Sequence, residues 1–373
     1  MNPEGEITVR LACAEQRVRG VTVTSSRTGL PPRLVRGRAA ADVRRLVPLL
    51  FSICSRAQGA ASASAIAAAQ APSAIGNPAR QTLEVMLEML QESVWRLLID
   101  WPRVLGEPTL VAPVATVRHA CNTVVDDGVT LDAMLAVADS MLVEHVYGVP
   151  PEAWLAATNL GVLDRWIERG PTLPARLLRR IRDDAPGLGL SDVALMPDAT
   201  FENLSRSLLG EMEVDPEYTR FPRWSGMPAE TGALARQVGA PLIAELLQRD
   251  GRTAATRFVA RLVELAVLVK DLRLRSGGRI APVRGHALGT GVGIGLAETA
   301  RGLLLHRVQL ERGLVTDYRI VAPTEWNFHP GGPLAQGLKG RAAADTAQLE
   351  REARTVVQSL DPCVACRVEI ADA

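Results

Sequence analysis

The sequence predicts a single, predominantly helical α+β domain with small β elements near both ends. Apolar residues recur at helical spacing through most of the 373-residue chain, whereas short strand-like alternation is confined to the beginning and to a hairpin after residue 300. Hydrophobic residues make up 47% of the chain and aromatic residues 4%. The core is therefore expected to be large and to consist mainly of Ala, Leu and Val. No internal repeat and no linker divides the chain.

Four segments are expected along this domain. Residues 1–25 form an N-terminal β element, and residues 40–275 form a helical body. Residues 276–335 carry a glycine loop and a β hairpin, and residues 340–373 form a C-terminal helix with a Cys-x-x-Cys tail. These boundaries follow changes in the period of the apolar residues and the positions of glycine and proline.

Apolar and polar residues alternate in the first segment. Ile7, Val9 and Leu11 are separated by polar residues, and Val21 and Val23 repeat the pattern after a polar stretch. This two-residue period is typical of a strand with one buried face, so we expect a small β element here.

Prolines shape the next part of the chain. Residues 30–32 (Leu-Pro-Pro) are expected to interrupt it, and a helix should follow with Asp42 as its N-cap and its end near Ile53. Pro48 should kink or interrupt that helix, because it lacks the amide proton of a helix interior. The Ala- and Ser-rich residues 57–76 permit close helix packing, with disorder as the alternative.

The clearest amphipathic helix covers residues 82–101. Its apolar side chains recur at intervals of three and four residues, which places them on one stripe. The residues on this stripe are Leu83, Met86, Leu87, Leu90, Val94, Leu97, Leu98 and Trp101. Further helices are predicted over residues 131–146, 174–183, 229–248 and 253–275.

Glycine returns after the helical body. Residues 276–278 (Ser-Gly-Gly) predict a turn, and residues 289–295, where every second residue is glycine, predict a glycine-rich loop. Close backbone packing explains this loop better than nucleotide binding, because no strand clearly precedes it and no acidic residue follows at the dinucleotide-binding distance. A hairpin should come next, with strands at residues 303–310 and 314–321 around a turn at 311–313.

Charge and cysteine content exclude several classes of protein. The 42 basic and 41 acidic residues argue against a nucleic-acid partner, and the basic run at residues 33–45 is interpreted as a solvated helix face. Five cysteines do not make a disulfide framework. The N-terminus lacks the basic and apolar regions of a signal peptide, and no run of about 18 apolar residues occurs. We expect a cytoplasmic protein without membrane insertion.

A Cys-x-x-Cys pair, Cys363 and Cys366, follows a predicted amphipathic helix near the end of the chain. Asp361 and Pro362 should end that helix, because proline disfavours the α conformation of the preceding residue. By itself the pair fits half of a zinc site, a thiol–disulfide couple or part of another metal site. The alternative is an exposed tail with two incidental cysteines. A structural zinc site would need two more ligands, and no second Cys-x-x-Cys exists.

Other chemically active residues have structural interpretations when taken singly. Arg301 is interpreted as a surface or helix-end charge, and His306 and His329 as hydrogen-bonded structural residues. Cys13 and Cys121 are expected to be ordinary buried thiols. No serine lies in a nucleophile elbow.

Several motifs together resemble those of nickel–iron hydrogenase large subunits. Residues 354–366 resemble the C-terminal motif Asp-Pro-Cys-x-x-Cys-x-x-His, and residues 298–306 are similar to Glu-Ala-Pro-Arg-Gly-x-x-x-His. Residues 318–330 resemble Tyr-x-x-Val-x-Pro-Thr-Thr-Trp-Asn-x-x-Pro. Near the N-terminus, residues 50–54 occupy the place of Arg-Ile-Cys-Gly-x-Cys-x-x-x-His. The order is preserved, and the specific matches lie between Glu298 and Cys366.

The departures from these motifs concern the metal ligands. The large subunits hold nickel with four thiolates, two of them shared with an iron that carries cyanide and carbon monoxide. Here Cys54 keeps the first thiolate of the N-terminal motif, Ala57 occupies the second, and Ala61 and Glu369 replace the two histidines. The resemblance leaves three candidate metal ligands, Cys54, Cys363 and Cys366.

This combination resembles accessory proteins of the HupK/HoxV type, which look like degenerate large subunits. The resemblance implies a degenerate large-subunit fold and a non-enzymatic scaffold or carrier for the Fe(CN)2CO unit during assembly of nickel–iron hydrogenase. Iron as Fe(CN)2CO would be bound transiently, and no nickel is expected. The implied partners are hydrogenase maturation chaperones and possibly the large-subunit precursor. The alternatives are a divergent hydrogenase-like metalloenzyme subunit and a metal-free docking protein for maturation chaperones.

The resemblance also assigns residues to the cargo. Arg301 would direct its guanidinium donors at a cyanide nitrogen, Thr324 would offer a hydroxyl to the second cyanide, and Pro323 would help wall the diatomic pocket. Glu325 departs from the family's threonine.

Overall fold

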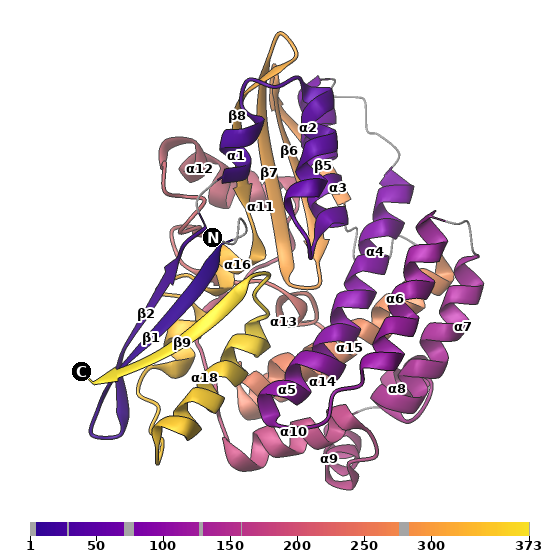
Figure 1. The fold of residues 1–373 in the computed structure, drawn as a ribbon, viewed down its shortest axis with the longest axis vertical. Coiled ribbons are helices and arrows are strands. Elements are labelled where there is room, and N and C mark those ends of the chain that lie inside the picture. Colours follow the sequence, from indigo (N-terminus) through magenta and orange to yellow (C-terminus); the bar gives the residue numbers. More distant parts are fainter. Residues whose placement is uncertain are drawn as a thin grey trace.

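The structure of the protein is a computed structural model that describes residues 5–27, 30–70, 78–126, 130–157, 159–275 and 283–372. The turn predicted at residues 276–278 and the end of the Ala-rich segment, residues 71–76, lie outside these ranges. Helices dominate the described chain, and small sheets are built from residues near its two ends (Figure 1). The predicted fold class is therefore confirmed.

The two ends of the chain share one sheet. Strands β1 (Glu6–Ala14) and β2 (Arg17–Ser25) confirm the expected β element and pair antiparallel, and the C-terminal strand β9 (Ala365–Asp372) runs parallel to β1 on its other edge. Figure 1 shows the yellow β9 beside the indigo β1. Ile7 lies opposite Cys366 in this register, so the N-terminal β element fixes the position of the cysteine tail.

Two expectations for the next segment are wrong in detail. Residues 30–32 do not interrupt the chain but begin helix α1 (Leu30–Val35), because proline is tolerated in a first helical turn. The N-cap of α2 (Ala40–Leu46) is Ala39, and Asp42 lies in the first turn. Pro48 interrupts the helix as predicted, since it opens a 3-10 turn, η1 (Val47–Leu50).

The Ala-rich segment forms helix α3 (Ser55–Gln70), which lies on a four-stranded antiparallel sheet (Figure 1). The strands of this sheet, in spatial order, are β5 (Val283–Gly289), β6 (Val292–Thr299), β7 (Gly302–Glu311) and β8 (Leu314–Val321). The predicted hairpin is β7–β8 and is confirmed.

The prediction of a glycine-rich loop at residues 289–295 is wrong, because residues 292–295 belong to strand β6. The close packing expected of these glycines is confirmed. A Cβ added to Gly293 would lie 2.3 Å from the carbonyl oxygen of Ala65, and one on Gly295 would lie 2.0 Å from that of Ala61. The glycines therefore let the backbone of α3 approach the sheet, and the sequence pattern of a turn arises from this approach.

Most of the chain between the sheets is helical. Its helices are α4 (Pro78–Trp95), α5 (Trp101–Leu105), α6 (Val111–Asp126), α7 (Leu131–Leu142), α8 (Pro151–Ala157), α9 (Leu160–Arg169), α10 (Leu173–Asp184), α11 (Phe201–Leu204), α12 (Gly210–Val214), α13 (Ala233–Arg236), α14 (Pro241–Asp250) and α15 (Ala254–Leu274). Wider π-helical turns, η2 (Arg96–Asp100), η3 (Val143–Tyr147) and η4 (Ser205–Leu209), and a two-strand pair, β3 (Ala194–Leu195) and β4 (Ala229–Glu230), complete this part.

The predicted helices at residues 82–101, 131–146, 174–183 and 253–275 are present, with η2 and η3 in the first two. The helix predicted at residues 229–248 is wrong as a continuous element. It consists of β4, α13 and α14, and Pro241 separates the two helices because Ala240 before it is extended.

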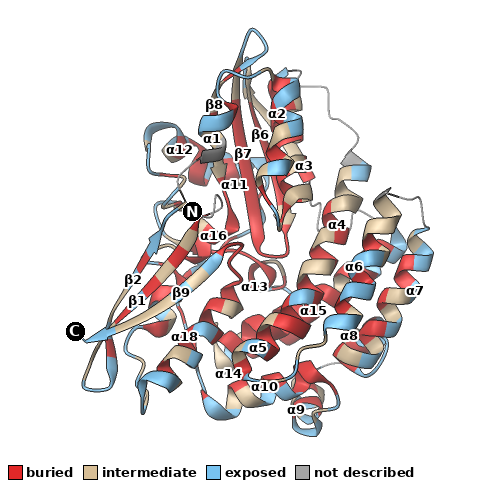
Figure 2. Cartoon of the chain, viewed as in Figure 1, coloured by how far each residue is buried: buried red, intermediate tan, exposed pale blue. Residues whose placement is uncertain are grey.

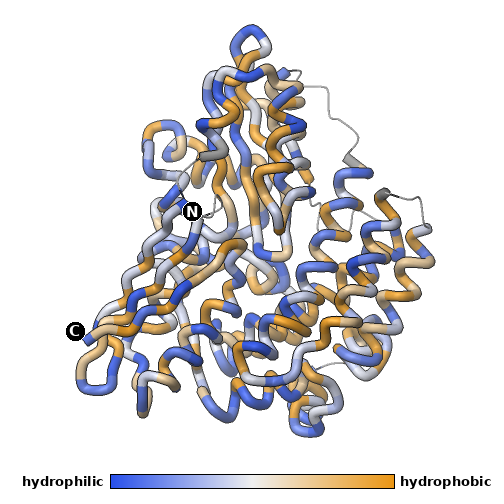
Figure 3. Tube along the Cα trace, in the orientation of Figure 1, coloured by the Kyte–Doolittle hydropathy of each residue, from blue (hydrophilic) through white to orange (hydrophobic). Residues whose placement is uncertain are grey.

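Helix α15 forms the centre of the body and is buried along most of its length (Figure 2). Phe258 of α15 contacts Trp101 edge-to-face, with ring centroids 4.4 Å apart. Hydrophobic and hydrophilic residues both recur within the turns of the surrounding helices (Figure 3). In the described part of the chain, no helix combines the length and the apolar character needed to cross a bilayer.

Candidate metal centre

Helix α18 (Thr346–Leu360) carries the C-terminal motif to the centre of the molecule. The Asp345 side chain caps it by accepting a hydrogen bond from the backbone amide of Gln348 at 2.7 Å. Its predicted apolar stripe is buried against the terminal sheet and comprises Leu349, Ala353, Val356, Val357 and Leu360. Each large apolar side chain buried here stabilises the docked helix by about 1.5–3 kcal/mol. The helix ends at Leu360, as predicted.

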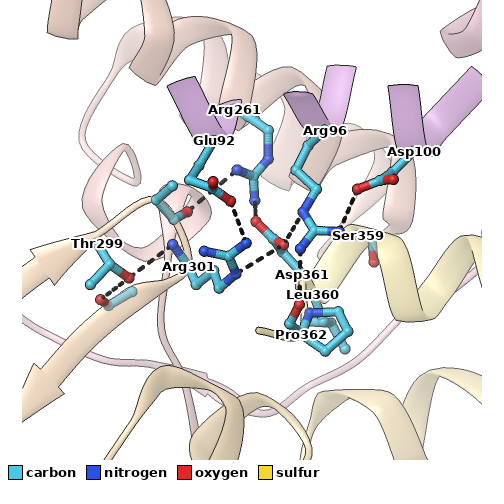
Figure 4. A network of polar contacts seen from close by, with 12 residues as sticks. Glu92, Arg96, Asp100, Arg261, Thr299, Arg301, Ser359, Leu360, Asp361 and Pro362 are labelled. Atoms are coloured by element: carbon cyan, nitrogen blue, oxygen red, sulfur yellow. Dashed lines mark hydrogen bonds and ion pairs between the residues drawn. The ribbon is translucent and has the colours of Figure 1, made fainter. Parts of the chain in front are cut away.

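Asp361 turns the chain towards Cys363 in the left-handed conformation, with φ of 54°. Its carboxylate is buried and forms ion pairs with Arg96 at 2.6 Å, Arg261 at 2.9 Å and Arg301 at 3.3 Å (Figure 4). We call these four residues the Asp361 cluster. Burial by itself would raise the pKa of Asp361, but the guanidinium charges outweigh it and the pKa is lowered. Arg96 also donates to the carbonyl of Pro362 at 3.0 Å, so the cluster fixes the turn before Cys363.

Arg301 lies between strands β6 and β7 and is 3% exposed. Besides Asp361, its guanidinium pairs with Glu92 of α4 at 2.6 Å. Burial would lower the pKa of Arg301, but Asp361, Glu92 and the thiols of Cys363 and Cys54 raise it. Arg301 is therefore not a surface charge. It is a permanent buried cation within electrostatic reach of Cys54 and Cys363.

The glycine of the Arg-Gly pair is required by close packing. Gly302 has φ of 132°, and a Cβ there would lie 2.4 Å from the methyl carbon of Thr231. A larger residue would clash with Thr231 and would need a backbone conformation that favours glycine.

Thr324 contacts Cys363 directly. It lies in the short helix α16 (Pro323–Asn327), and its hydroxyl donates to the Cys363 sulfur at 3.1 Å. The backbone amide of Cys363 in turn donates to the Thr324 hydroxyl oxygen at 3.3 Å. Pro323, at the first position of α16, is buried beside them. The motif residue Thr324 thus lies at the Cys363 thiol, and Pro323 precedes it in α16; the contact of either residue with a cargo stays a prediction.

Cys54 lies just before α3 and is buried. Burial raises the pKa of its thiol, the nearby Cys363 and Glu88 raise it further, and Arg301 lowers it. Cys54 and Cys363 are therefore brought together from opposite ends of the chain. Glu88 of α4 fixes the start of α3, because its carboxylate accepts hydrogen bonds from the backbone amides of Arg56 at 2.8 Å and Ala57 at 3.1 Å.

A chain of neutral hydrogen bonds supports the Cys54 thiol. The side-chain amide of Gln58 donates to the sulfur at 3.6 Å, and its carbonyl oxygen lies 2.8 Å from Nε2 of His306. Since that oxygen can only accept, Nε2 carries the proton and Nδ1 accepts from the Tyr318 hydroxyl at 2.7 Å. Burial lowers the pKa of His306 to about 3, so the ring is neutral. We call Cys54, Gln58, His306 and Tyr318 the Gln58 chain.

The third predicted ligand, Cys366, has a different environment. It is half-buried on β9, and burial raises its pKa to about 12, with Arg354 and Glu6 as its charged neighbours. A cavity of about 390 Å³ is lined by both Cys363 and Cys366. Among the residues that the structure describes, no three His, Cys, Asp or Glu side chains are grouped closely enough to hold a metal ion. Participation of Cys366 in a metal site stays a prediction.

Arg27 is a site residue that the sequence did not reveal. It follows β2, and its Nη1 donates to Glu325 at 2.8 Å and to the Cys363 sulfur at 3.5 Å. Burial would lower its pKa, but Cys363 and Glu325 raise it, so the guanidinium is permanently charged. The departure of Glu325 from the family's threonine was the available signal, because a buried carboxylate requires a cationic or hydrogen-bonding partner.

The fold defines a class of protein, since the chain has the architecture of nickel-containing hydrogenase chains. It superposes on a chain of the Ni-Fe-Se hydrogenase of Desulfovibrio vulgaris Hildenborough with a TM-score of 0.59, covering 95% of both chains at 16% identity. For the enzyme of Desulfomicrobium baculatum the TM-score is 0.58, with the same coverage and identity. The family described as Nickel-dependent hydrogenase matches residues 251–369.

Curated relatives define the family more closely. The chain is 30% identical to "Hydrogenase expression/formation protein HoxV" of Cupriavidus necator, covering 98% of this chain and 96% of that protein. It is 32% identical to "Hydrogenase expression/formation protein HupK" of Azotobacter vinelandii, covering 91% of each. The chain belongs to this HoxV/HupK family of hydrogenase expression/formation proteins. The resemblance inferred from the sequence motifs is thereby confirmed.

Proposed function

We propose that this protein is an assembly scaffold or carrier for the Fe(CN)2CO unit during nickel–iron hydrogenase maturation and is not itself a hydrogenase. The names of its relatives, hydrogenase expression/formation proteins, support a maturation role and point to an accessory protein rather than to the catalytic enzyme. The observation that carries the proposal is the meeting of two buried thiols with a permanent cation: the segment before Cys54 lines one cavity with Cys363, and Arg301 is close enough for its charge to act on both thiols.

The donor set suits a soft metal that is to be released again. Thiolates are preferred ligands of iron, and each thiol must lose its proton when it binds the metal. Ala57 and Ala61 are fully buried at the positions where the large-subunit motif has a ligand and a histidine. A site with fewer thiolates than a complete nickel–iron centre would bind the iron unit and later surrender it.

The residues around the thiols supply donors for an anionic cargo. Arg301 is permanently charged, and the hydroxyl of Thr324 can rotate away from the Cys363 sulfur to donate elsewhere. In the proposed function Arg301 and Thr324 donate to the cyanide nitrogens and Pro323 walls the pocket. Maturation chaperones and possibly the hydrogenase large-subunit precursor would deliver and receive the cargo.

Infrared spectroscopy combined with metal analysis tests the proposal. The protein should be purified anaerobically from a host that assembles nickel–iron hydrogenase, with the Cys54→Ser/Cys363→Ser double variant as control. We expect cyanide and carbonyl stretching bands, stoichiometric iron and no nickel in the wild type, and none of these bands in the double variant. Wild-type protein without iron and without bands would overturn the proposal.

A metal-free docking protein is the second candidate. It is favoured by one observation, namely that no group of three metal-ligating side chains occurs within the described ranges. Such a protein would keep the large-subunit fold in order to bind maturation chaperones, and the Cys54→Ser/Cys363→Ser variant would then bind those chaperones as tightly as the wild type.

A further inference from the structure

A second arginine reaches the Cys363 thiol from an element that the large-subunit motifs do not include. Arg27 follows β2 in the N-terminal sheet, and its side chain is largely enclosed, with 17% exposed. It ends 3.5 Å from the Cys363 sulfur. The sheet fixes the position of Arg27 relative to the cysteine tail, because β1 pairs with both β2 and the cysteine-bearing β9.

The hydrogen bonds that the structure describes for Arg27 use one of the three nitrogens of its guanidinium. Both described contacts, to Glu325 and to Cys363, come from the single nitrogen Nη1. Within the part of the chain that the structure describes, Nη2 and Nε have no hydrogen-bond partner. Arg27, Thr324 and Glu325 line one cavity of about 230 Å³. Cys363 is not among the residues that line this cavity, but Arg27 and Thr324 both contact its sulfur, so Arg27 presents N–H donors between the cavity and the thiol.

Glu325 cannot perform this task itself. An ionised carboxylate only accepts hydrogen bonds, so it cannot donate to an anionic ligand, whereas a threonine at this position could. Its Oε1 holds Nη1 of Arg27, and its Oε2 is buried without a hydrogen-bond partner. A buried carboxylate oxygen without a partner costs about 1–3 kcal/mol, so fold stability alone does not favour glutamate here. Glutamate is favoured at this position because it holds Arg27 in place.

We propose that Arg27 is a ligand-binding residue of this protein, donating to the anionic ligands of the thiolate-bound iron unit, and that Glu325 is its positioning residue. The inference rests on the proposed function. Arg27 supplies N–H donors from the N-terminal sheet, and Arg301 supplies them from the β6–β7 turn. Arg27 thereby supplies a hydrogen-bond donor near position 325, where glutamate replaces the threonine of the family. Because Arg27 also contacts the Cys363 sulfur, it binds the ligating atom and its cargo together.

Cyanide-stretch frequencies and iron retention test this assignment. Wild type, Arg27→Gln, Arg27→Lys and Glu325→Gln should be isolated in the same anaerobic way, and iron loss to an excess of chelator should be timed. We expect Arg27→Gln to lose iron about tenfold to hundredfold faster, as for removal of a charge-assisted hydrogen bond, and to shift a cyanide band. Arg27→Lys, which keeps the charge without the planar fork, should fall between, and Glu325→Gln should have a smaller effect.

A charge-exchange variant separates ligand binding from a structural ion pair. Arg27→Glu/Glu325→Arg can re-form the pair but moves the guanidinium away from position 27, so its iron loss should remain fast. Restored retention in this variant would overturn the assignment. Arg182→Gln is the control, because Arg182 forms a partly enclosed ion pair with Asp164 on α9, at the same distance of 2.8 Å as the pair of Arg27 with Glu325. The melting temperature of each variant without cargo shows whether a change reflects unfolding.

The outcomes distinguish this inference from the proposed function. Wild type with cyanide bands, together with unchanged bands and retention in Arg27→Gln, would overturn only the role of Arg27. Wild type without bands would overturn both.

Discussion

The two buried thiols are held by networks of opposite character. Cys363 is surrounded by ions, since the Asp361 cluster fixes its turn and Arg27 and Arg301 place charge beside it. The charges of Arg301 and Glu88 also reach Cys54, but the hydrogen bond to its sulfur comes from the Gln58 chain, in which His306 is neutral. A charged network can offer spare donors and charge to an anionic ligand, whereas a neutral chain can only position a sulfur atom. We infer that the residues around Cys363 determine how long the cargo is retained. The residues around Cys54 determine the position of its sulfur atom.

Replacing the thiols tests this comparison most strongly. We expect Cys363→Ser and Cys366→Ser each to abolish bound iron while the fold remains intact, because a hydroxyl is a poor ligand for a soft metal. Cys54→Ser should have a comparable or smaller effect. Iron per protein after anaerobic purification is the measurement.

Cys13→Ser and Cys121→Ala serve as controls and should retain wild-type iron. Undiminished iron in both Cys363→Ser and Cys366→Ser would contradict the thiolate assignment. Loss in Cys363→Ser alone would limit the site to Cys363 and Cys54.

Removing the carboxylate of the Asp361 cluster should have the next largest effect. Asp361→Ala leaves Arg96, Arg261 and Arg301 without their shared partner in a buried site, and such a change costs about 3–5 kcal/mol in the free energy of unfolding. Urea-induced unfolding of the protein without cargo measures it.

Asp317 provides the matched control. Its carboxylate also pairs with arginines, including Arg307 at 3.1 Å and Arg319 at 3.0 Å, but its side chain is 22% exposed against 1% for Asp361. Asp317→Ala should therefore cost less, because solvent compensates the freed charges. Equal losses in the two variants would show that burial of the Asp361 carboxylate adds nothing to the cost of removing it.

Arg301 should have an intermediate effect on cargo retention. Arg301→Lys keeps the charge but loses the planar fork, and Arg301→Leu loses both. A charge-assisted hydrogen bond contributes about 1.5–3 kcal/mol, or about one to two decades in affinity, so retention should weaken moderately in the lysine variant and severely in the leucine variant. Cyanide-band intensity per protein measures retention. Equal intensities and frequencies in all three proteins would confine Arg301 to a structural role.

The pH dependence of the free energy of unfolding should show that His306 of the Gln58 chain is neutral. The pKa of His306 is about 3 in the folded protein against 6.5 for a free side chain. Because the folded-state pKa is depressed, the unfolded chain binds the extra proton first, and stability present above pH 6.5 is lost as the pH falls towards 3. One such proton contributes a slope of about 1.4 kcal/mol per pH unit. His306→Gln should reduce this slope in unfolding measurements between pH 6.5 and 4, and an unchanged slope would contradict a buried neutral ring.

Much of the candidate site was accessible from short motifs. Cys54, Arg301, Thr324 and Cys363 were named from segments that resemble large-subunit motifs, and the structure brings them together. Arg27 was missed, because it lies in no motif and meets its partners Glu325 and Cys363 only in the folded chain. The ion pairs of Asp361 were also missed, because Arg96, Arg261 and Arg301 come from three separate parts of the chain.

The sequence by itself determined the local elements: the strands of the N-terminal β element, the long helices α4, α15 and α18, the β7–β8 hairpin and the end of α18 at Leu360. Each follows from the period of the apolar residues or from proline chemistry, which act over a few neighbouring residues. Only the tertiary structure decided that β9 joins β1, that Gly293 and Gly295 lie in a strand beneath α3, and that Cys54 lies beside Cys363. Periodicity shows which face of an element is buried but not what covers it, because that depends on packing between segments far apart in the chain.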